Sequence, residues 1–526
     1  MDVTETSDQA QLHQARGKIL IGLVLAMGLA AMDTTIVATA IPSIVRDLGG
    51  FALFAWVFSL YVLTQAATIP IYGKLADLYG RKPMLIAGIL IFLAGSVLSG
   101  TAWNMVMLII FRGIQGIGAG AIQPIVTTLA GDLYNVAERA RIQGWLSSVW
   151  GISAVVGPAI GGFFAEYASW RWIFYINIPL GALAIIMIGA YLHEDVSHQR
   201  RYIDYAGAAL LSIAVGLMIF GVLEGGMGWP WLSTQSTLVF ATAAMALVLF
   251  VGQERRAIEP ILPLWVFSRR LLIGANLATV ALGLLSIGLT TFLPTYAQGV
   301  LGADAVIAGF ILAVMSISWP VASALSGQLF LRIGFRDTAL IGAGFCLASG
   351  LIFVSLAASA PAWLAAAGSL VMGAGLGLLS TPLIVGIQSV VDWNRRGVVT
   401  GTNMFARQIG QAVGAAIFGS VVNTALAGWF HHAPANIARQ LPAAVNTVGQ
   451  VLGSSPHHLG TAAAAYTRQG LYLAIHQVFW GLTLIAIFSG VALLLLPRHF
   501  DRLHVAEDGS GASPHTMSYD KGYYHK

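Results

Sequence analysis

Charged residues are scarce in this sequence. Asp, Glu, Lys and Arg make up 9% of its 526 residues, while 57% are hydrophobic. Soluble globular proteins carry about 25% charged residues, so this chain lacks the charge that coats a water-exposed surface. The composition also excludes a coiled coil, a collagen, a secreted disulfide scaffold and a nucleic-acid-binding protein. The 60 glycines fall within apolar stretches, which is typical of helices that pack closely in a bilayer. The composition indicates a polytopic membrane protein.

Cysteine and the common catalytic motifs are nearly absent as well. The single cysteine, Cys346, cannot form an intramolecular disulfide. There is no phosphate-binding Gly-x-x-x-x-Gly-Lys-Ser/Thr pattern, no zinc-binding His-Glu-x-x-His pattern and no convergent Ser/His/Asp cluster. ATP therefore does not drive this chain directly, a membrane enzyme is the less favoured alternative, and we predict no cofactor. The pairs His431-His432 and His457-His458 are interpreted as loop surface, so no metal site is predicted.

Fourteen apolar stretches lie between residues 17 and 496. Each is close to the length of about 20 residues that crosses a bilayer. Cytoplasmic loops are enriched in Lys and Arg. With the N-terminus in the cytoplasm, 21 of the 27 Lys and Arg residues fall on the cytoplasmic side and 4 fall outside, while Arg112 and Arg407 lie within spans. Both termini are then cytoplasmic, which requires an even number of spans.

An internal repeat divides the chain. The stretch 73–82, after the second span, and the stretch 327–336, after the tenth, share two glycines, a leucine and a basic residue at a constant offset of 254. Two related six-helix sets are typical of transporters. The predicted organisation is a cytoplasmic N-tail (1–16), an N-terminal six-helix bundle (17–192), inserted helices seven and eight (193–256), a C-terminal six-helix bundle (257–497) with an external loop (427–469), and a cytoplasmic C-tail (498–526).

Five motifs in order carry a resemblance to a known family. The stretch 73–82 resembles the loop motif of the major facilitator superfamily, and 108–120 resembles the arginine-bearing motif of its fourth helix. The stretch 151–162 resembles the motif of its proton-coupled antiporters, while 32–42 and 170–179 resemble the fourteen-span drug:proton antiporters of the EmrB/QacA type. The resemblance covers nearly the whole chain. It implies an all-α integral membrane protein with 14 transmembrane helices in the major facilitator fold, as two six-helix bundles plus two inserted helices.

Asp33 and Arg112 are charged residues within predicted spans. Placing a charge at the centre of a membrane helix costs at least about 2.5–3.5 kcal/mol. At 1.5 Å per residue both are expected roughly 12–14 Å below the outer surface, a depth at which they can meet. We hypothesise that Asp33 is the main proton carrier and that Arg112 is its partner in proton coupling. Competition between a proton and the substrate for this carboxylate would produce antiport. The alternative is a permanent ion pair that joins two helices.

Two further sets of residues are assigned roles. The predicted substrate cavity is lined by polar and aromatic side chains: Trp56, Tyr61, Gln65, Gln115, Trp150, Asn403, Arg407, Gln408 and Gln411. For the stripe 403–411, cavity lining and contact between helices are both open. The resemblance implies a conformational role for the cytoplasmic latch and for the glycine motif that would seal one bundle against the other: Gly73, Asp77, Gly80, Arg81, Lys82, Gly157, Pro158, Gly161 and Gly162.

The resemblance implies a function. It is the proton-coupled efflux of lipophilic, cationic drugs and toxic compounds across the cytoplasmic (inner) membrane by alternating access, with the proton gradient as energy source. The expected partners are lipophilic small molecules, protons and the lipid bilayer, without nucleic acid. Related exporters also work with a periplasmic adaptor protein. The alternative is dedicated export of one endogenous metabolite, such as a siderophore, a lipid or a self-made antibiotic.

Overall fold

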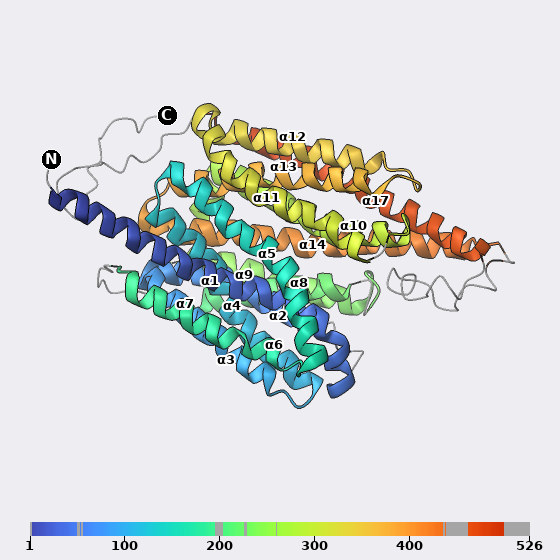
Figure 1. Ribbon diagram of the computed structural model, residues 1–526, viewed down its shortest axis with the longest axis horizontal. Helices are drawn as coiled ribbons and strands as arrows, with labels where there is room; N and C mark the ends of the chain where they lie inside the picture. Colours follow the sequence, from blue (N-terminus) through green and yellow to red (C-terminus); the bar gives the residue numbers. More distant parts are fainter. Residues whose placement is uncertain are drawn as a thin grey trace.

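The computed structural model is a bundle of long helices (Figure 1). It describes residues 3–49, 53, 56–194, 204–225, 229–258, 260–303, 305–434, 437 and 461–498. Every named element in this part of the chain is helical, as the apolar composition predicts. The predicted loop 427–469 is described only at its ends, and both ends are helical, because one helix continues to His431 and another begins at Thr461. His457, His458 and residues 499–526 of the predicted C-tail lie outside the described residues.

The first group of helices, called the N-half, runs from Val3 to Tyr191. Its members are α1 (Val3–Leu48), α2 (Trp56–Tyr79), α3 (Arg81–Gly100), α4 (Met105–Leu133), α5 (Val136–Tyr167), α6 (Trp172–Tyr175) and α7 (Asn177–Tyr191). The Asn104 side chain accepts a bond from the Met107 N–H and caps α4, while Asn135 and Glu138 form a capping box on α5. Such caps satisfy free N–H groups and fix where a helix begins.

The second group, called the C-half, follows a helix pair. The pair is α8 (Tyr205–Glu224) and α9 (Thr234–Glu254), of which α8 packs on both α2 and α14. The C-half contains η2 (Leu264–Phe267), α10 (Arg270–Gly299), α11 (Ala305–Ile333), α12 (Phe335–Val354), α13 (Ala362–Ser389), η3 (Trp393–Arg395), α14 (Arg396–His431) and α17 (Thr461–Leu494). The pair α8–α9 thus lies at the seam between the halves.

Thirteen of the described helical segments are long and apolar enough to cross a membrane, with α6 and α7 counted as one crossing. α2 is a further long helix of 24 residues that packs along α4 in the N-half. It is more polar because it carries side chains such as Gln65 and Lys74. Together with α2, the described crossings match the fourteen spans predicted from the sequence.

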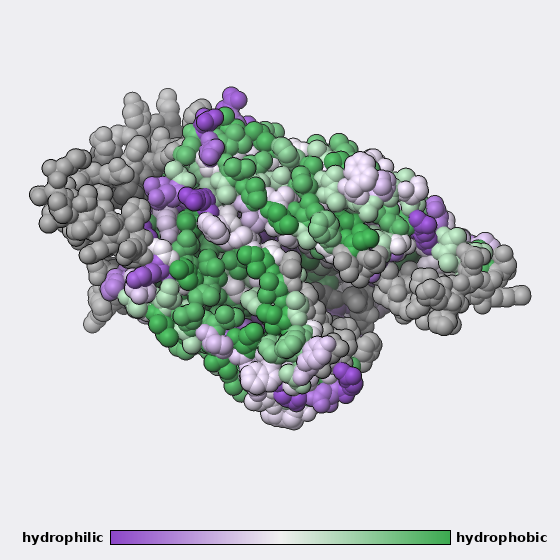
Figure 2. Space-filling model, viewed as in Figure 1, coloured by the Kyte–Doolittle hydropathy of each residue, from purple (hydrophilic) through white to green (hydrophobic). Residues whose placement is uncertain are grey.

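The surface is banded. Figure 2 shows apolar residues over the middle of the visible face and hydrophilic residues toward its ends. Large exposed hydrophobic side chains on the helices include Phe310, Ile317, Trp480 and Leu484. Because apolar surface is unfavourable in water and favourable in hydrocarbon, this band is the surface that faces lipid.

The two halves meet mainly through α5 with α11 and α2 with α14. We call the end that carries Arg81, Arg139, Arg396 and Arg498 the basic end. At this end the backbone of Gly73 in α2 lies directly against α14. Toward the opposite end, the C-half helices and the N-half helices α1, α3 and α7 run apart (Figure 1). The halves are therefore closed against one another at the basic end.

The two copies of the internal repeat have the same backbone at their second glycine. Gly80 precedes α3 with a φ of 97°, and Gly334 precedes α12 with a φ of 91°. Residues with a side chain rarely adopt such positive φ values, so glycine is needed at both turns. The structure thus supports the relation between the halves that the spacing of 254 residues indicates.

Candidate functional site

Asp33 lies inside α1, away from both ends of the helix, and 1% of the residue is exposed. Its Oδ2 accepts a hydrogen bond from Arg112 Nη1 of α4 at 2.5 Å, and its Oδ1 accepts one from Gln115 Nε2 at 2.8 Å. Asn177 Nδ2 of α7 lies 3.5 Å from the same Oδ1. Three donors from two other helices surround the carboxyl group, an arrangement that suits its ionised form because an ionised carboxylate only accepts hydrogen bonds.

Arg112 is fully buried in the same cluster. Its Nε donates to the Val57 carbonyl at 3.3 Å, its Nη1 also donates to Gln115 Oε1 at 2.7 Å, and its guanidinium carbon lies 4.1 Å from the centre of the Tyr61 ring. Its Nη2 has no described partner. A buried charge whose partner is removed costs several kcal/mol. Neutralisation of Asp33 would therefore leave Arg112 without its counter-charge.

Gln115 and Tyr61 lie in this cluster and not in the cavity between the halves, where we had predicted them. At most 1% of either residue is exposed, and both contact the Arg112 guanidinium. Polar and aromatic side chains within a span indicate either a cavity wall or an internal network. Here α1, α2 and α4 pack so closely that these two side chains point into the N-half. They support the charged pair.

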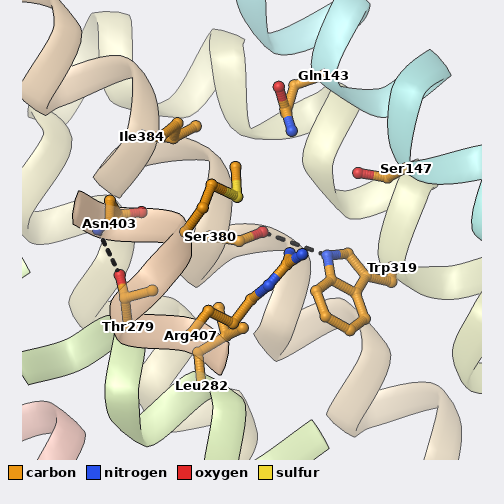
Figure 3. Close-up of a pocket in the computed structure, with 10 residues that line it drawn as sticks. Gln143, Ser147, Thr279, Leu282, Trp319, Ser380, Ile384, Asn403 and Arg407 are labelled. Carbon is orange, nitrogen blue, oxygen red and sulfur yellow. Dashed lines mark hydrogen bonds between the residues drawn. The ribbon is translucent and has the colours of Figure 1, made fainter. Parts of the chain in front are cut away.

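A small cavity of about 40 Å³ lies between the halves (Figure 3). It is lined by Gln143 and Ser147 of α5, Thr279 and Leu282 of α10, Trp319 of α11, Ser380 and Ile384 of α13, and Asn403, Met404 and Arg407 of α14. A space of this size holds about two or three water molecules. Sites for drug-sized ligands span roughly 300–1,000 Å³. A drug-sized molecule therefore does not fit between the halves in this arrangement.

Two of the predicted cavity residues, Asn403 and Arg407, line this cavity. Asn403 Nδ2 also donates to Thr279 Oγ1 of α10 at 2.8 Å, so the stripe on α14 serves both cavity lining and contact between helices. Trp56 packs against Phe220 of α8 instead, with ring centres 5.5 Å apart. The predicted residues that do not line this cavity are Trp56, Tyr61, Gln65, Gln115, Trp150, Gln408 and Gln411.

Asp77, near the end of α2, joins the halves at the basic end. Its Oδ1 accepts a hydrogen bond from the backbone N–H of Gly397 at 2.9 Å, and its Oδ2 accepts one from Val398 at 2.8 Å. These N–H groups belong to the first turn of α14, where an α-helix has free donors and partial positive charge. A carboxylate of the N-half thus binds the N-terminus of a C-half helix.

Arg81 extends this contact into a charged cluster. It lies 2.9 Å from Asp77 and 3.2 Å from Asp132 of α4, and it stacks on the Trp393 ring at 3.5 Å. Arg396 of α14 reaches Asp132 from the other half at 2.9 Å. Because Asp132 is shared by an arginine of each half, the cluster binds the halves together. We call Asp77, Arg81, Asp132, Trp393 and Arg396 the latch.

The latch carries a pH dependence that can be measured. Burial raises the pKa of the Asp77 carboxyl from 3.8 to about 7, although the charge of Arg81 and the N–H groups of Val398 and Gly397 lower it. When the halves separate, water solvates the carboxyl and its pKa returns toward about 4. The closed arrangement therefore binds the proton more tightly. Lowering the pH through about 7 is expected to stabilise closure at the basic end, and raising it to weaken closure.

Spin labels on Ala137→Cys and Asn394→Cys, with Cys346 replaced by serine, would measure the distance between the halves at this end. The shorter distance should gain population as the pH falls from about 8 to about 6. Asp77→Asn does not titrate and should flatten this dependence. A pH dependence of the same size in Asp77→Asn would show that another group is responsible.

Two residues with structural contacts near the latch, Glu194 and Gln388, were not predicted from the sequence. Glu194 accepts hydrogen bonds from the backbone N–H groups of Arg81 and Lys82, both at 2.9 Å, and so caps α3. Lys82, which was predicted to share the conformational role of Asp77 and Arg81, instead donates from its Nζ to the Gly189 carbonyl of α7 at 2.8 Å, a contact within the N-half. Gln388 of α13 donates to the Thr127 carbonyl of α4 at 3.2 Å and thereby links the halves. The sequence held a signal for Glu194, because an acidic side chain near the N-terminus of a helix is electrostatically favourable.

The second copy of the repeat, which lies wholly within the described residues, has no acid at the position that corresponds to Asp77. The position 254 residues after Asp77 is Leu331, which is 43% exposed. The helix that would face it, α5, is capped by its own Asn135 and Glu138. Among the described residues, the acids of the charged contact between the halves therefore come from the N-half alone. Asp77 binds the N-terminus of α14 and Asp132 binds Arg396.

The glycine motif of α5 lies differently from our expectation. A side chain at Gly157 would meet Thr35 of α1, which belongs to the same half, while nothing lies within 4 Å of a side chain at Gly162. α5 approaches the C-half instead at Gly144, beside Ala324, and at Gly151, beside the Ser316 carbonyl. Gly161 is buried, and the Pro158 side chain lies outside the described residues. In this arrangement Gly157 and Gly162 do not seal the two halves.

Comparison with known proteins assigns a family to this geometry. Residues 23–415 match the sequence profile of the Major Facilitator Superfamily. The chain belongs to this superfamily. It is 34% identical over 504 residues to the multidrug transporter protein MdtP of Bacillus subtilis (strain 168), which covers 92% of this chain and 93% of that protein. It is 38% identical over 416 residues to the multidrug resistance protein 3 of the same strain, covering 79% and 81%.

The fold comparison agrees with the sequence comparison. The crystal structure of the human organic anion transporter MFSD10 (TETRAN) matches with a TM-score of 0.61 over 92% of this chain and 99% of that chain, at 13% identity. At this identity the likeness shows the fold alone. The predicted superfamily and the major facilitator fold are confirmed. Its members are multi-pass membrane transporters of small molecules and not enzymes, and the Bacillus relatives agree with the drug antiporter type.

Proposed function

We propose that this superfamily member exports lipophilic compounds in exchange for protons, with the basic end and both termini in the cytoplasm. The observation that carries the proposal is the buried pair of Asp33 and Arg112. Among the described residues, Asp33 is the carboxylate that lies inside a spanning helix and away from the ends of that helix. A carboxylate can take up and release a proton at such a position, whereas an arginine stays charged. The printed names of the relatives support drugs as substrates.

A short chain of contacts leads from the proton site to the interface between the halves. Two residues after Asp33, Thr35 Oγ1 donates to the Ser153 carbonyl of α5 at 2.9 Å. Two residues before Ser153, Gly151 lies against the Ser316 carbonyl of α11. Protonation of Asp33 would release α1 from Arg112, and a shift of α1 would move α5 against the C-half. This supports rocking of the two bundles as the transport motion.

The charge of the substrate is a separate question. That the substrates are cationic stays a prediction. No acidic residue is among those that line the cavity, so its wall offers no counter-charge to a cation. Export of a single endogenous metabolite would use the same proton chemistry. It would differ from drug export only in the range of compounds that the cavity accepts. A periplasmic adaptor and the inner-membrane location also stay predictions.

The test is transport in proteoliposomes with an imposed pH gradient and a panel of lipophilic dyes. We expect the protein to move several dyes against their concentration gradients and to dissipate the pH gradient as it does so. Movement of one compound and no other would favour the dedicated exporter. Dye transport that ignores the pH gradient would contradict proton coupling, although the protein would still be a transporter.

A further inference from the structure

The cavity between the halves contains a cation without a counter-charge. Arg407 extends from α14 toward Trp319 and Ser380 (Figure 3). Its Nε is buried and has no hydrogen-bond partner among the described residues. No residue that lines the cavity is an Asp or Glu, and no described carboxylate forms an ion pair with Arg407. Arg112 and Arg81, by contrast, each have an acidic partner within 3.2 Å.

A guanidinium with no acidic partner among the described residues is unusual in such a place. Arginine remains protonated at all physiological pH values, and its planar group presents five N–H donors. The Arg407 side chain is partly buried, with its Nε wholly enclosed, and a charge between helices is normally paired because removing it from water is costly. Here the helices have placed the charge at the edge of a space large enough for about two or three water molecules. The space and the missing counter-charge together suit a small anionic group.

Neighbouring groups add donors to this space. Trp319 Nε1 donates to Ser380 Oγ at 3.2 Å, so the Ser380 hydroxyl hydrogen is available to a ligand. Gln143 and Ser147 supply an amide and a hydroxyl from α5 on the opposite wall. The site therefore combines one permanent cation with neutral donors from both halves, which is the composition that binds an oxyanion. A ligand held between α5 and α14 would also contact both moving bundles.

We propose that Arg407 forms a subsite for the anionic head group of the exported compound, a carboxylate or similar oxyanion on a lipophilic body. The head group takes the place of the waters, and the lipophilic body occupies the space that opens when the halves separate. The inference rests on the proposed export function and names its substrate class. Ser380, Gln143 and Ser147 are positioning donors beside the cation.

The test compares two probes that differ in one group. Dansyl-phenylalanine carries a carboxylate, and dansyl-phenylalanine amide is neutral. Binding to the purified full-length protein is followed by energy transfer from tryptophan to the dansyl group, since Trp319 is part of the cavity wall. We expect the wild type to bind the carboxylate at least about tenfold more tightly than the amide, a typical effect of one charge-assisted bond.

Matched variants assign the preference to the guanidinium. Arg407→Gln should lower the affinity for the carboxylate about tenfold and change that for the amide by less than about twofold. Arg407→Lys keeps the charge and should keep most of the preference. Ser380→Ala should weaken binding of the carboxylate probe by about threefold and leave binding of the amide unchanged. If Arg407→Gln weakens both probes equally, Arg407 supports the fold and the proposal is overturned.

Two other results would also overturn the proposal. One is tighter binding of ethidium, a lipophilic cation, than of the carboxylate in the wild type. The other is a protein that binds the two probes equally but whose tryptophan fluorescence changes with chloride, and only when Arg407 is present. The occupant of the site would then be an inorganic anion. Binding in detergent needs no proton gradient. A carboxylate preference that persists while a pH gradient drives no export would therefore refute proton coupling and leave the anion subsite standing.

Discussion

Asp33→Asn is expected to abolish uphill export while leaving exchange of substrate across the membrane. A carboxamide has nearly the shape of the carboxylate but does not titrate, so a proton gradient has no group on which to act. One pH unit is worth about 1.4 kcal/mol per proton, or about a tenfold accumulation. The variant should lose this accumulation and the associated proton flux. Dye accumulation and intravesicular pH, recorded together in proteoliposomes, measure both quantities.

The control must separate lost coupling from lost folding. Asp33→Asn leaves Arg112 buried without its anion, a cost of several kcal/mol in comparable pairs. The double variant Asp33→Asn/Arg112→Gln removes both charges and should recover thermal stability, yet still show no proton coupling. If the double variant again couples transport to protons, the pair has the structural role that the sequence left open and the proton is carried elsewhere. Retained exchange of dye shows that either variant is folded.

Sequence reasoning located the charges of this protein better than their partners. Asp33 and Arg112 stand out because each interrupts an apolar run. The pairing of Asp132 with Arg396 joins residues 264 positions apart, and at the level of sequence both look like ordinary charges at helix ends. Pairing across two halves depends on how the bundles dock, which no local pattern encodes. The sequence did hold a signal for Gln115, since a residue three positions after Arg112 lies on the same helix face.

Prediction of the cavity from the sequence was limited for the same reason. Its wall takes residues from five helices of both halves, and Trp319 and Gln143 were not among those predicted. The stripe on α14 was visible because Asn403 and Arg407 are four residues apart. The opposite wall was not visible, because Gln143 and Ser147 are ordinary polar residues near the end of a span. A cavity between rigid bodies is a property of their arrangement.

Gly73→Leu is expected to hold the basic end open and to reduce transport by at least about tenfold. A Cβ at Gly73 would lie 2.7 Å from the Gly397 carbonyl oxygen and 3.3 Å from the Gly401 Cα. These are backbone atoms of α14 and cannot rotate away, so the helices must separate, which also pulls Asp77 from the α14 N-terminus. The N-half itself should fold, because leucine favours a helix over glycine by about 0.8–1 kcal/mol.

Gly344→Leu is the matched control, since nothing lies within 4 Å of a side chain at this position of α12. It should transport as the wild type does. The distance between labels on Ala137→Cys and Asn394→Cys should lengthen in Gly73→Leu and stay unchanged in Gly344→Leu. Close approach of α2 and α14 would be dispensable if Gly73→Leu kept both the short distance and normal transport. A variant with normal thermal stability, a long distance and no transport would show instead that export requires this end to close in every cycle, since a carrier held in one state cannot alternate.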